Sequence, residues 1–351
     1  MSERTVSDEM VPELDGERVL KKWLFAAALM CVGVIPVHVA TTSAATTDGR
    51  THLSHPVAAV ASGGTIAFVV ARGGDDFIDT MNADGTDKHQ LADCGPGECY
   101  PSWSPDGGEI VFQREFDGVG IYVMNANGTD VRRLSATPAA DVRPSWSANG
   151  REIIFSRVVG TATGGGIPPT DIDVMDANGT DVRTILSADG TFNIEPRWSP
   201  TGSKIVFMSG RNQSQQIYTM NVNGTDLRMI THQGANGDPF WSPNGARISF
   251  GSNRAGGGKL NVYTMNSTGG DVRQLTHFLP PMEAGDTSWS PNGEVIAFEA
   301  DDGGNGQSNP NARAFVWTVD ANGTRATTTH VRCAAVGCAP RWRPTSDGAG
   351  H

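Results

Sequence analysis

A repeated tryptophan motif constrains this chain more than any other feature. Five segments share Trp-Ser-x-x-Gly followed by a run of the form Ile-x-Phe, and their tryptophans are about 43 to 52 residues apart. A period of this length is typical of one four-stranded blade of a β-propeller. The five motifs begin at Trp103, Trp146, Trp198, Trp241 and Trp289.

A second motif, Met-Asn-Ala-Asn-Gly-Thr-Asp or a variant of it, recurs between the tryptophans. The two motifs together predict four strands per unit. Pro-x-Trp-Ser forms a short inner strand, and Ile-x-Phe alternates with the period of two that a strand requires. The Asn-Gly pair makes a tight hairpin into a charged outer strand. Six copies of the second motif begin at Met81, Met124, Met175, Met220, Met265 and Val319.

The two ends of the repeat region are each incomplete. The first unit has Ile66 and Phe68 but no motif tryptophan, whereas the last unit has Trp342 with no Ile-x-Phe after it. We therefore expect the strand around Trp342 to complete the blade begun by residues 63–92. In the alternative, residues 56–61 supply that inner strand and Trp342 is an extra edge. The expected fold is all-β, a six-bladed β-propeller of four-stranded antiparallel blades closed by pairing the N- and C-terminal partial blades.

Composition agrees with many short strands joined by turns. The 351 residues include 43 Gly and 20 Pro, and the net charge is −11. Nucleic-acid binding would require a basic stripe, and the sequence has none, so we expect no nucleic-acid partner. The acidic balance leaves basic proteins or cations as partners.

The N-terminus has the features of an export signal. Lys21 and Lys22 precede an apolar run, and small residues follow as far as Ala45. The apolar run can also just span a bilayer, so an uncleaved signal anchor over residues 23–40 is the alternative. We expect residues 1–45 to be a leader with this signal or anchor, 46–60 a linker, 61–345 the propeller and 346–351 a tail. The protein is then periplasmic or extracellular, a monomer, and meets a membrane only through an uncleaved signal.

The repeat Pro-x-Trp-Ser-Pro-Asp-Gly, Ile-x-Phe, Ile-Tyr-x-Met-Asn-x-x-Gly, Arg-x-Leu-Thr resembles that of the TolB family over about residues 60–345. The resemblance implies a periplasmic propeller that binds an envelope protein. In TolB a separate N-terminal α/β domain contacts inner-membrane Tol proteins. Only about 15 residues lie between the export signal and the first blade here, so a full Tol-system role is in doubt. We expect a non-catalytic binding or scaffold module for a cell-envelope protein or glycan.

A metal-assisted channel enzyme of the propeller lyase or hydrolase kind is the alternative function. Oligogalacturonate lyases use related propellers with clustered metal-binding histidines. The candidates here are His232 and His277, which occupy matching positions in adjacent repeats. Both follow an outer strand, so solvent-facing histidines explain them better. The sequence shows no catalytic constellation, and we expect no catalytic residue, metal site or cofactor.

Four cysteines lie in two matching loops of the propeller region. Cys94 and Cys99 have the same spacing as Cys333 and Cys338, and each pair precedes a repeat tryptophan. Export favours two local disulfides. A four-thiolate zinc site is the alternative, because ring closure makes the two loops neighbours.

Acidic residues recur just before the repeat tryptophans. The third residue before the tryptophan is Glu195, Asp238 and Asp286 in three consecutive units, and the fifth adds Glu98 and Asp141. Inner strands of a propeller begin at the rim of its central channel, so these acids are expected to gather at the channel mouth. Such a group favours a basic partner or a cation such as Ca²⁺. Separate acids that each solvate a loop or cap a turn are the simpler interpretation.

Overall fold

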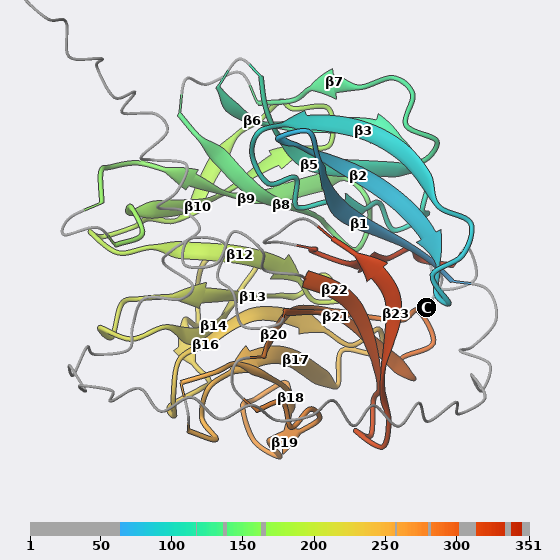
Figure 1. The fold of residues 1–351 in the computed structure, drawn as a ribbon. Helices are drawn as coiled ribbons and strands as arrows, with labels where there is room; N and C mark the ends of the chain where they lie inside the picture. Colours follow the sequence, from blue (N-terminus) through green and yellow to red (C-terminus); the bar gives the residue numbers. More distant parts are fainter. Residues whose placement is uncertain are drawn as a thin grey trace, which may run out of the picture.

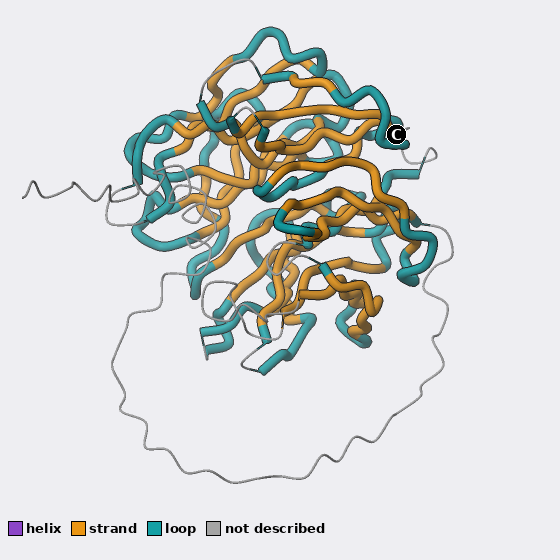
Figure 2. Tube along the Cα trace, turned by 45° about the horizontal axis from the view of Figure 1, so that its top comes forward, coloured by secondary structure: helices purple, strands orange, loops and turns teal. Residues whose placement is uncertain are grey.

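A computed structural model describes residues 64–345 except 117, 136–138, 163–165, 257, 280–281, 302–313 and 334–337. The predicted leader (1–45), linker (46–60) and tail (346–351) therefore lie outside the described residues. The described part contains strands and turns without a helix (Figure 2). It accordingly holds no helical segment with the length and hydropathy needed to cross a membrane.

The described strands form six four-stranded antiparallel sheets, as the repeats predict. Blades 2 to 6 each use four consecutive strands, whereas blade 1 has the order β24-β1-β2-β3. The strands are β1 (Thr65–Arg72), β2 (Asp75–Asn82), β3 (His89–Gly95), β4 (Ser102–Trp103), β5 (Glu109–Glu115), β6 (Val119–Asn125), β7 (Arg132–Arg133), β8 (Asp141–Trp146), β9 (Glu152–Val158), β10 (Thr170–Asp176), β11 (Arg183–Leu186), β12 (Asn193–Trp198), β13 (Lys204–Ser209), β14 (Gln216–Asn221), β15 (Arg228–Met229), β16 (Asn236–Trp241), β17 (Arg247–Ser252), β18 (Asn261–Asn266), β19 (Arg273–Gln274), β20 (Glu283–Trp289), β21 (Val295–Asp301), β22 (Ala314–Asp320), β23 (Ala326–Arg332) and β24 (Arg341–Trp342).

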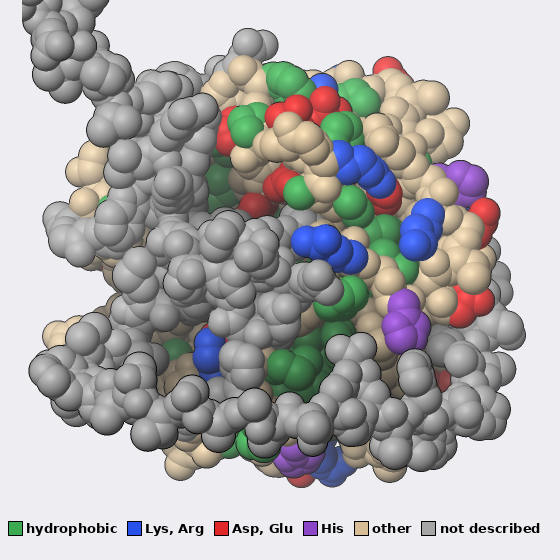
Figure 3. Space-filling model, in the orientation of Figure 1, with side chains coloured by type: hydrophobic (Ala, Val, Ile, Leu, Met, Phe, Trp, Pro, Cys, Tyr) green, Lys and Arg blue, Asp and Glu red, His purple; other side chains and the backbone are tan. Residues whose placement is uncertain are grey.

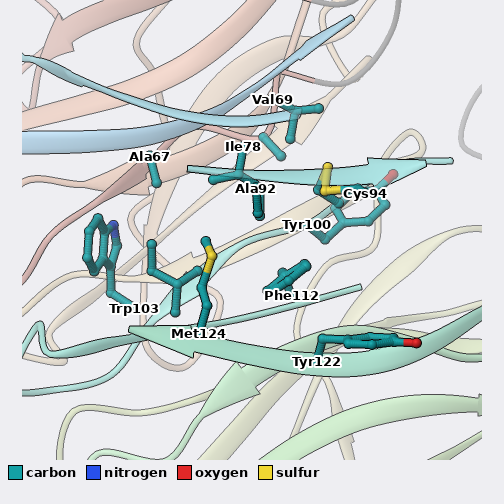
Figure 4. Packing of buried hydrophobic residues seen from close by; sticks show 13 residues of the cluster. Ala67, Val69, Ile78, Ala92, Cys94, Tyr100, Trp103, Phe112, Tyr122 and Met124 are labelled. Carbon is teal, nitrogen blue, oxygen red and sulfur yellow. A yellow bond between two sulfur atoms is a disulfide. The ribbon is translucent and has the colours of Figure 1, made fainter. Parts of the chain in front are cut away.

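The hydrophobic cores lie between neighbouring blades. Alternate residues of β1 face opposite ways, so Ala67 and Val69 pack against blade 2 whereas Ile66 and Phe68 pack against blade 6. Figure 4 shows the core between blades 1 and 2, where residues of both sheets meet. The phenylalanine of every Ile-x-Phe run is fully buried: Phe68, Phe112, Phe155, Phe207, Phe250 and Phe298.

The C-terminal strand closes the ring, which confirms that prediction. Trp342 pairs with Ile66 and Arg341 pairs with Ala67, so β24 takes the inner place of blade 1 (Figure 1, where blue β1 lies beside the red strands). The alternative with Trp342 as an extra edge is therefore wrong. The Trp342 ring covers Gly64 so closely that a Cβ at Gly64 would lie 2.4 Å from it.

Inner strands differ in length from blade to blade. Blades 3 to 6 have inner strands of six or seven residues, longer than the Pro-x-Trp-Ser segment predicts. Blades 1 and 2 have only β24 and β4, with two residues each. These inner strands carry the residues of the site described next.

Candidate functional site

A left-handed residue occurs at the same place in every inner segment. Six non-glycine residues there have φ between 37° and 61°, a region that most residues avoid. In blades 3 to 6 the pairing of the inner strand also shifts at this place, so each strand carries a bulge. A bulge re-aims a side chain out of its ladder. We call the six residues the mouth residues: Tyr100, Arg143, Glu195, Asp238, Asp286 and Ala339.

Arg143 joins three consecutive blades at this level. Its Nη1 forms an ion pair with Glu195, and its Nη2 donates to the Tyr100 hydroxyl at 2.7 Å. The Arg143 guanidinium carbon also lies 3.9 Å from the centre of the Tyr100 ring. Arg143 and Glu195 are both more than nine-tenths buried. The carboxylates that surround it raise the pKa of Arg143 despite its burial, so it stays charged.

Two further carboxyl groups lie beside this ion pair. The Asp238 backbone N–H donates to Glu195 Oε2 at 2.8 Å, which holds the two acids in neighbouring blades together. Burial raises the pKa of Asp238 well above its ordinary value, and the charges of Glu195 and Asp286 raise it further. Asp238 and Asp286 are only partly buried, so both still face solvent.

Two arginines lie next to the acids, at the residue before the repeat tryptophan in blades 4 and 1. Arg197 and Arg341 come from opposite blades, and both guanidinium groups lie over the Phe240 ring, at 5.4 and 5.6 Å from its centre. Burial, followed by the charge of Arg341, lowers the pKa of Arg197 to about 9. Arg341 Nη2 lies 3.7 Å from Asp286. One pocket is lined by Glu195, Arg197, Asp238, Pro239, Phe240, Asp286, Thr287 and Arg341.

The sequence-predicted acids therefore divide into two groups. Glu195, Asp238 and Asp286 line one pocket. Glu98 is half-buried near them, and its pKa is raised well above the usual value by burial, although Arg143 opposes this shift. Asp141 is fully buried elsewhere, with Arg157 Nε and Nη2 at 2.8 and 3.1 Å from its oxygens. Its carboxylate thus serves blade 3 and not the pocket.

The arginines of the site were missed at the sequence level. The acids suggested mutual repulsion, but Arg143, Arg197 and Arg341 supply three compensating charges from within the chain. The residue before the repeat tryptophan could have indicated two of them, because Arg197 and Arg341 occupy a position that is serine in three other blades. The Ca²⁺ hypothesis stays a prediction. Among the described residues no three His, Cys, Asp or Glu side chains are grouped as metal ligands.

The histidine and cysteine predictions lie outside this pocket. His232 and His277 are exposed, and histidines on the face in Figure 3 lie apart from one another. Acidic and basic side chains are interspersed among the described residues of that face. The predicted disulfides are formed between Cys94 and Cys99 and between Cys333 and Cys338. The zinc alternative is not realised.

Comparison with known families decides the relationship. The family model described as the TolB beta propeller domain matches residues 58–165 and 156–306. The chain belongs to this family. Comparison with curated proteins gives no match.

Solved structures share the fold of this TolB-family chain. TolB from Acinetobacter baumannii is 20% identical with a TM-score of 0.65, over 80% of this chain and 67% of that one. A candidate TolB from Agrobacterium tumefaciens is 20% identical with a TM-score of 0.61, over 79% and 92%. An oligogalacturonate lyase in complex with manganese is 14% identical with a TM-score of 0.52, over 75% and 72%. At these identities the likeness concerns the fold alone.

Proposed function

We propose that this chain is an exported, non-catalytic binding module whose channel mouth receives a basic segment of a cell-envelope protein. The observation that carries the proposal is the gathering of Glu195, Asp238 and Asp286 from three consecutive blades into one pocket. Glu195 is paired with Arg143, whereas Asp286 has a longer 3.7 Å contact with Arg341, and both Asp238 and Asp286 are only partly buried. These two carboxylates are the ones that a partner's lysine or arginine reaches.

Two further observations support export and protein binding. The two disulfides agree with an oxidising compartment. Membership of the TolB family favours an envelope protein over a glycan as the partner. Fold alone does not decide function, and the charges of the pocket are the feature that favours a basic partner.

The test begins with affinity capture from an envelope extract, using the full chain as bait and identifying the captured protein. Its dissociation constant is then compared between the parent and the variant Asp238→Asn/Asp286→Asn, which leaves the Arg143–Glu195 pair intact. Hydrogen bonds to charged groups contribute about 1.5–3 kcal/mol, so binding should weaken at least about tenfold. The salt dependence of binding should also decrease, because fewer charges face the partner.

The matched control changes the same kind of charge at the opposite end of the blades. Asp87, Asp130 and Asp181 are exposed in the hairpins after the third strand of their blades, each with φ between 53° and 57°. Asparagine tolerates that conformation, so Asp87→Asn/Asp130→Asn/Asp181→Asn should fold normally. The proposal fails if both variants bind alike, or if the purified parent shows a metal-dependent lyase or hydrolase activity that the mouth variant loses.

A further inference from the structure

The two blades with short inner strands are the two blades that contain a disulfide cysteine at the start of that strand. Cys338 precedes β24 and Cys99 precedes β4, and both inner strands have two residues. The corresponding strands of blades 3 to 6 have six or seven residues and no disulfide. Covalent cross-links thus occur where the inner ladder is shortest.

Each disulfide joins one blade to the next. Cys94 lies in the outer strand β3 of blade 1, and Cys99 lies in the inner segment of blade 2. Cys333 directly follows the outer strand β23 of blade 6, and Cys338 lies in the inner segment of blade 1. The two bonds therefore flank blade 1, the only blade assembled from both ends of the described chain.

The cysteine backbones also replace part of the missing ladder. The Val69 N–H donates to the Cys338 carbonyl at 2.8 Å, and the Gln113 N–H donates to the Cys99 carbonyl at 2.7 Å. Cys333 and Cys338 belong to the core between blades 6 and 1 together with Trp342. The pairing of β24 with β1 consists of two residue pairs. Next to them, the Arg343 N–H donates to the Thr65 carbonyl at 2.7 Å.

Both cross-links are directly connected to the channel mouth. Cys99 is followed by Tyr100, whose hydroxyl accepts from Arg143. Cys338 is followed by Ala339, and Arg341 lies two residues further on, beside Asp286. Movement of either cysteine segment therefore changes a neighbour of the mouth acids.

We infer that the two disulfides form a redox-sensitive clasp on either side of blade 1, which holds the Cys338 segment on β1 and the Cys99 segment on β5 and so fixes the mouth residues. A dithiol reductant opens the clasp by thiol–disulfide exchange. Each protein disulfide accepts two electrons and two protons and becomes two thiols, while the dithiol becomes a cyclic disulfide. In the reduced protein the Cys338 segment with β24 opens from β1 more often, as does the Cys99 segment from β5, while blades 3 to 5 keep their six-residue inner ladders. This inference is independent of the identity of any partner.

Amide hydrogen exchange of the full chain tests the clasp with and without dithiothreitol. A disulfide that closes so short a loop constrains the chain by about 2 kcal/mol, which corresponds to about 30-fold in the opening equilibrium. Reduction should accelerate exchange of the Val69 and Arg343 amides by about that factor. The Ile230 and Leu275 amides, which bond within blades 4 and 5 at 2.9 and 2.8 Å, should change by less than about threefold.

Two variants separate the cross-links, and a third controls for the reductant. Cys333→Ser/Cys338→Ser should accelerate Val69 and Arg343 most, whereas Cys94→Ser/Cys99→Ser should accelerate Gln113 most. The variant with all four substitutions should not respond to dithiothreitol. Equal acceleration in all blades, or none at Val69 and Arg343 once mass spectrometry shows that both disulfides are reduced, would overturn the inference. If a variant does not fold, the reductant series on the parent chain still decides between these outcomes.

Discussion

The Asp238 backbone N–H donates to the Glu195 carboxylate at 2.8 Å, and this bond holds two acidic residues of neighbouring blades side by side. Their proximity, the charge of Asp286 and above all burial raise the pKa of Asp238. We therefore expect the stability of the protein to depend on the protonation of Asp238.

Replacing Asp238 with asparagine should make the protein more stable at neutral and alkaline pH. A carboxyl group whose pKa is raised on folding binds its proton more tightly in the folded state. Its contribution to the free energy of unfolding is therefore lost as the pH rises above the pKa of the group in the unfolded chain, which is about 4. Asp238→Asn removes that loss, so urea unfolding from pH 4 upward should show a shallower decline than the parent. Parallel curves for the two proteins would contradict this expectation.

Asp76 offers a second, narrower pH window in blade 1. Burial, with a smaller effect from Asp75, raises its pKa to about 7. The free energy of unfolding should therefore decrease between about pH 4 and pH 7, where Asp76 loses its proton, and this decrease should level off above pH 7. Asp76→Asn should flatten the stability curve in that interval only. A difference from the parent that first develops above pH 7 would argue against the assignment.

Replacing either member of the Arg143–Glu195 ion pair should destabilise the protein. Removing one member of a buried pair leaves an uncompensated charge and costs about 3–5 kcal/mol. Arg143→Met should therefore lose about this much stability, and Glu195→Gln should lose less because glutamine can still accept from Asp238. The double variant should be more stable than the sum of the two losses implies, as measured by a double-mutant cycle in urea. Additive losses would show that the two residues act separately.

The sequence predicted the blade count and the closing strand because both depend on repeated local patterns. Ile-x-Phe and Asn-Gly recur in each unit, and the missing tryptophan of the first unit is supplied by Trp342. The meeting of Glu195, Asp238 and Asp286 was also predictable, since symmetry places equivalent positions around one axis.

The balance of charge at the mouth could not be predicted in the same way. Asp141 follows the same spacing rule as Glu98, but Arg157 in the adjacent strand binds it within blade 3. Arg197 and Arg341 act across the ring, and their contacts depend on tertiary distances that no repeat motif encodes. The two-residue length of β4 and β24 likewise became evident only from the strand pairing in the structure.

Gly64 should not tolerate a side chain. Its ideal Cβ position lies 2.4 Å from the Trp342 ring, so alanine forces β24 away from β1. Gly64→Ala should cost about 1–3 kcal/mol, the usual range for overpacking. Gly160→Ala is the control, because its nearest contact would be an ordinary 3.4 Å to Pro169. Thermal melts in which the two variants behave alike would exclude a specific effect on closure.

Trp342 should contribute more to stability than the equivalent tryptophan of blade 4. Trp342 is 8% exposed and packs in the core between blades 6 and 1, whereas Trp198 is only partly buried. Truncation of a buried tryptophan to alanine costs about 3–5 kcal/mol, and closure of the ring should keep Trp342→Ala at the upper end. Trp198→Ala should cost clearly less. Urea unfolding of both variants measures the difference, with deletion of residues 339–351 as the more severe change. A deletion variant that unfolds at the same urea concentration as the parent would show that β24 does not hold the propeller closed.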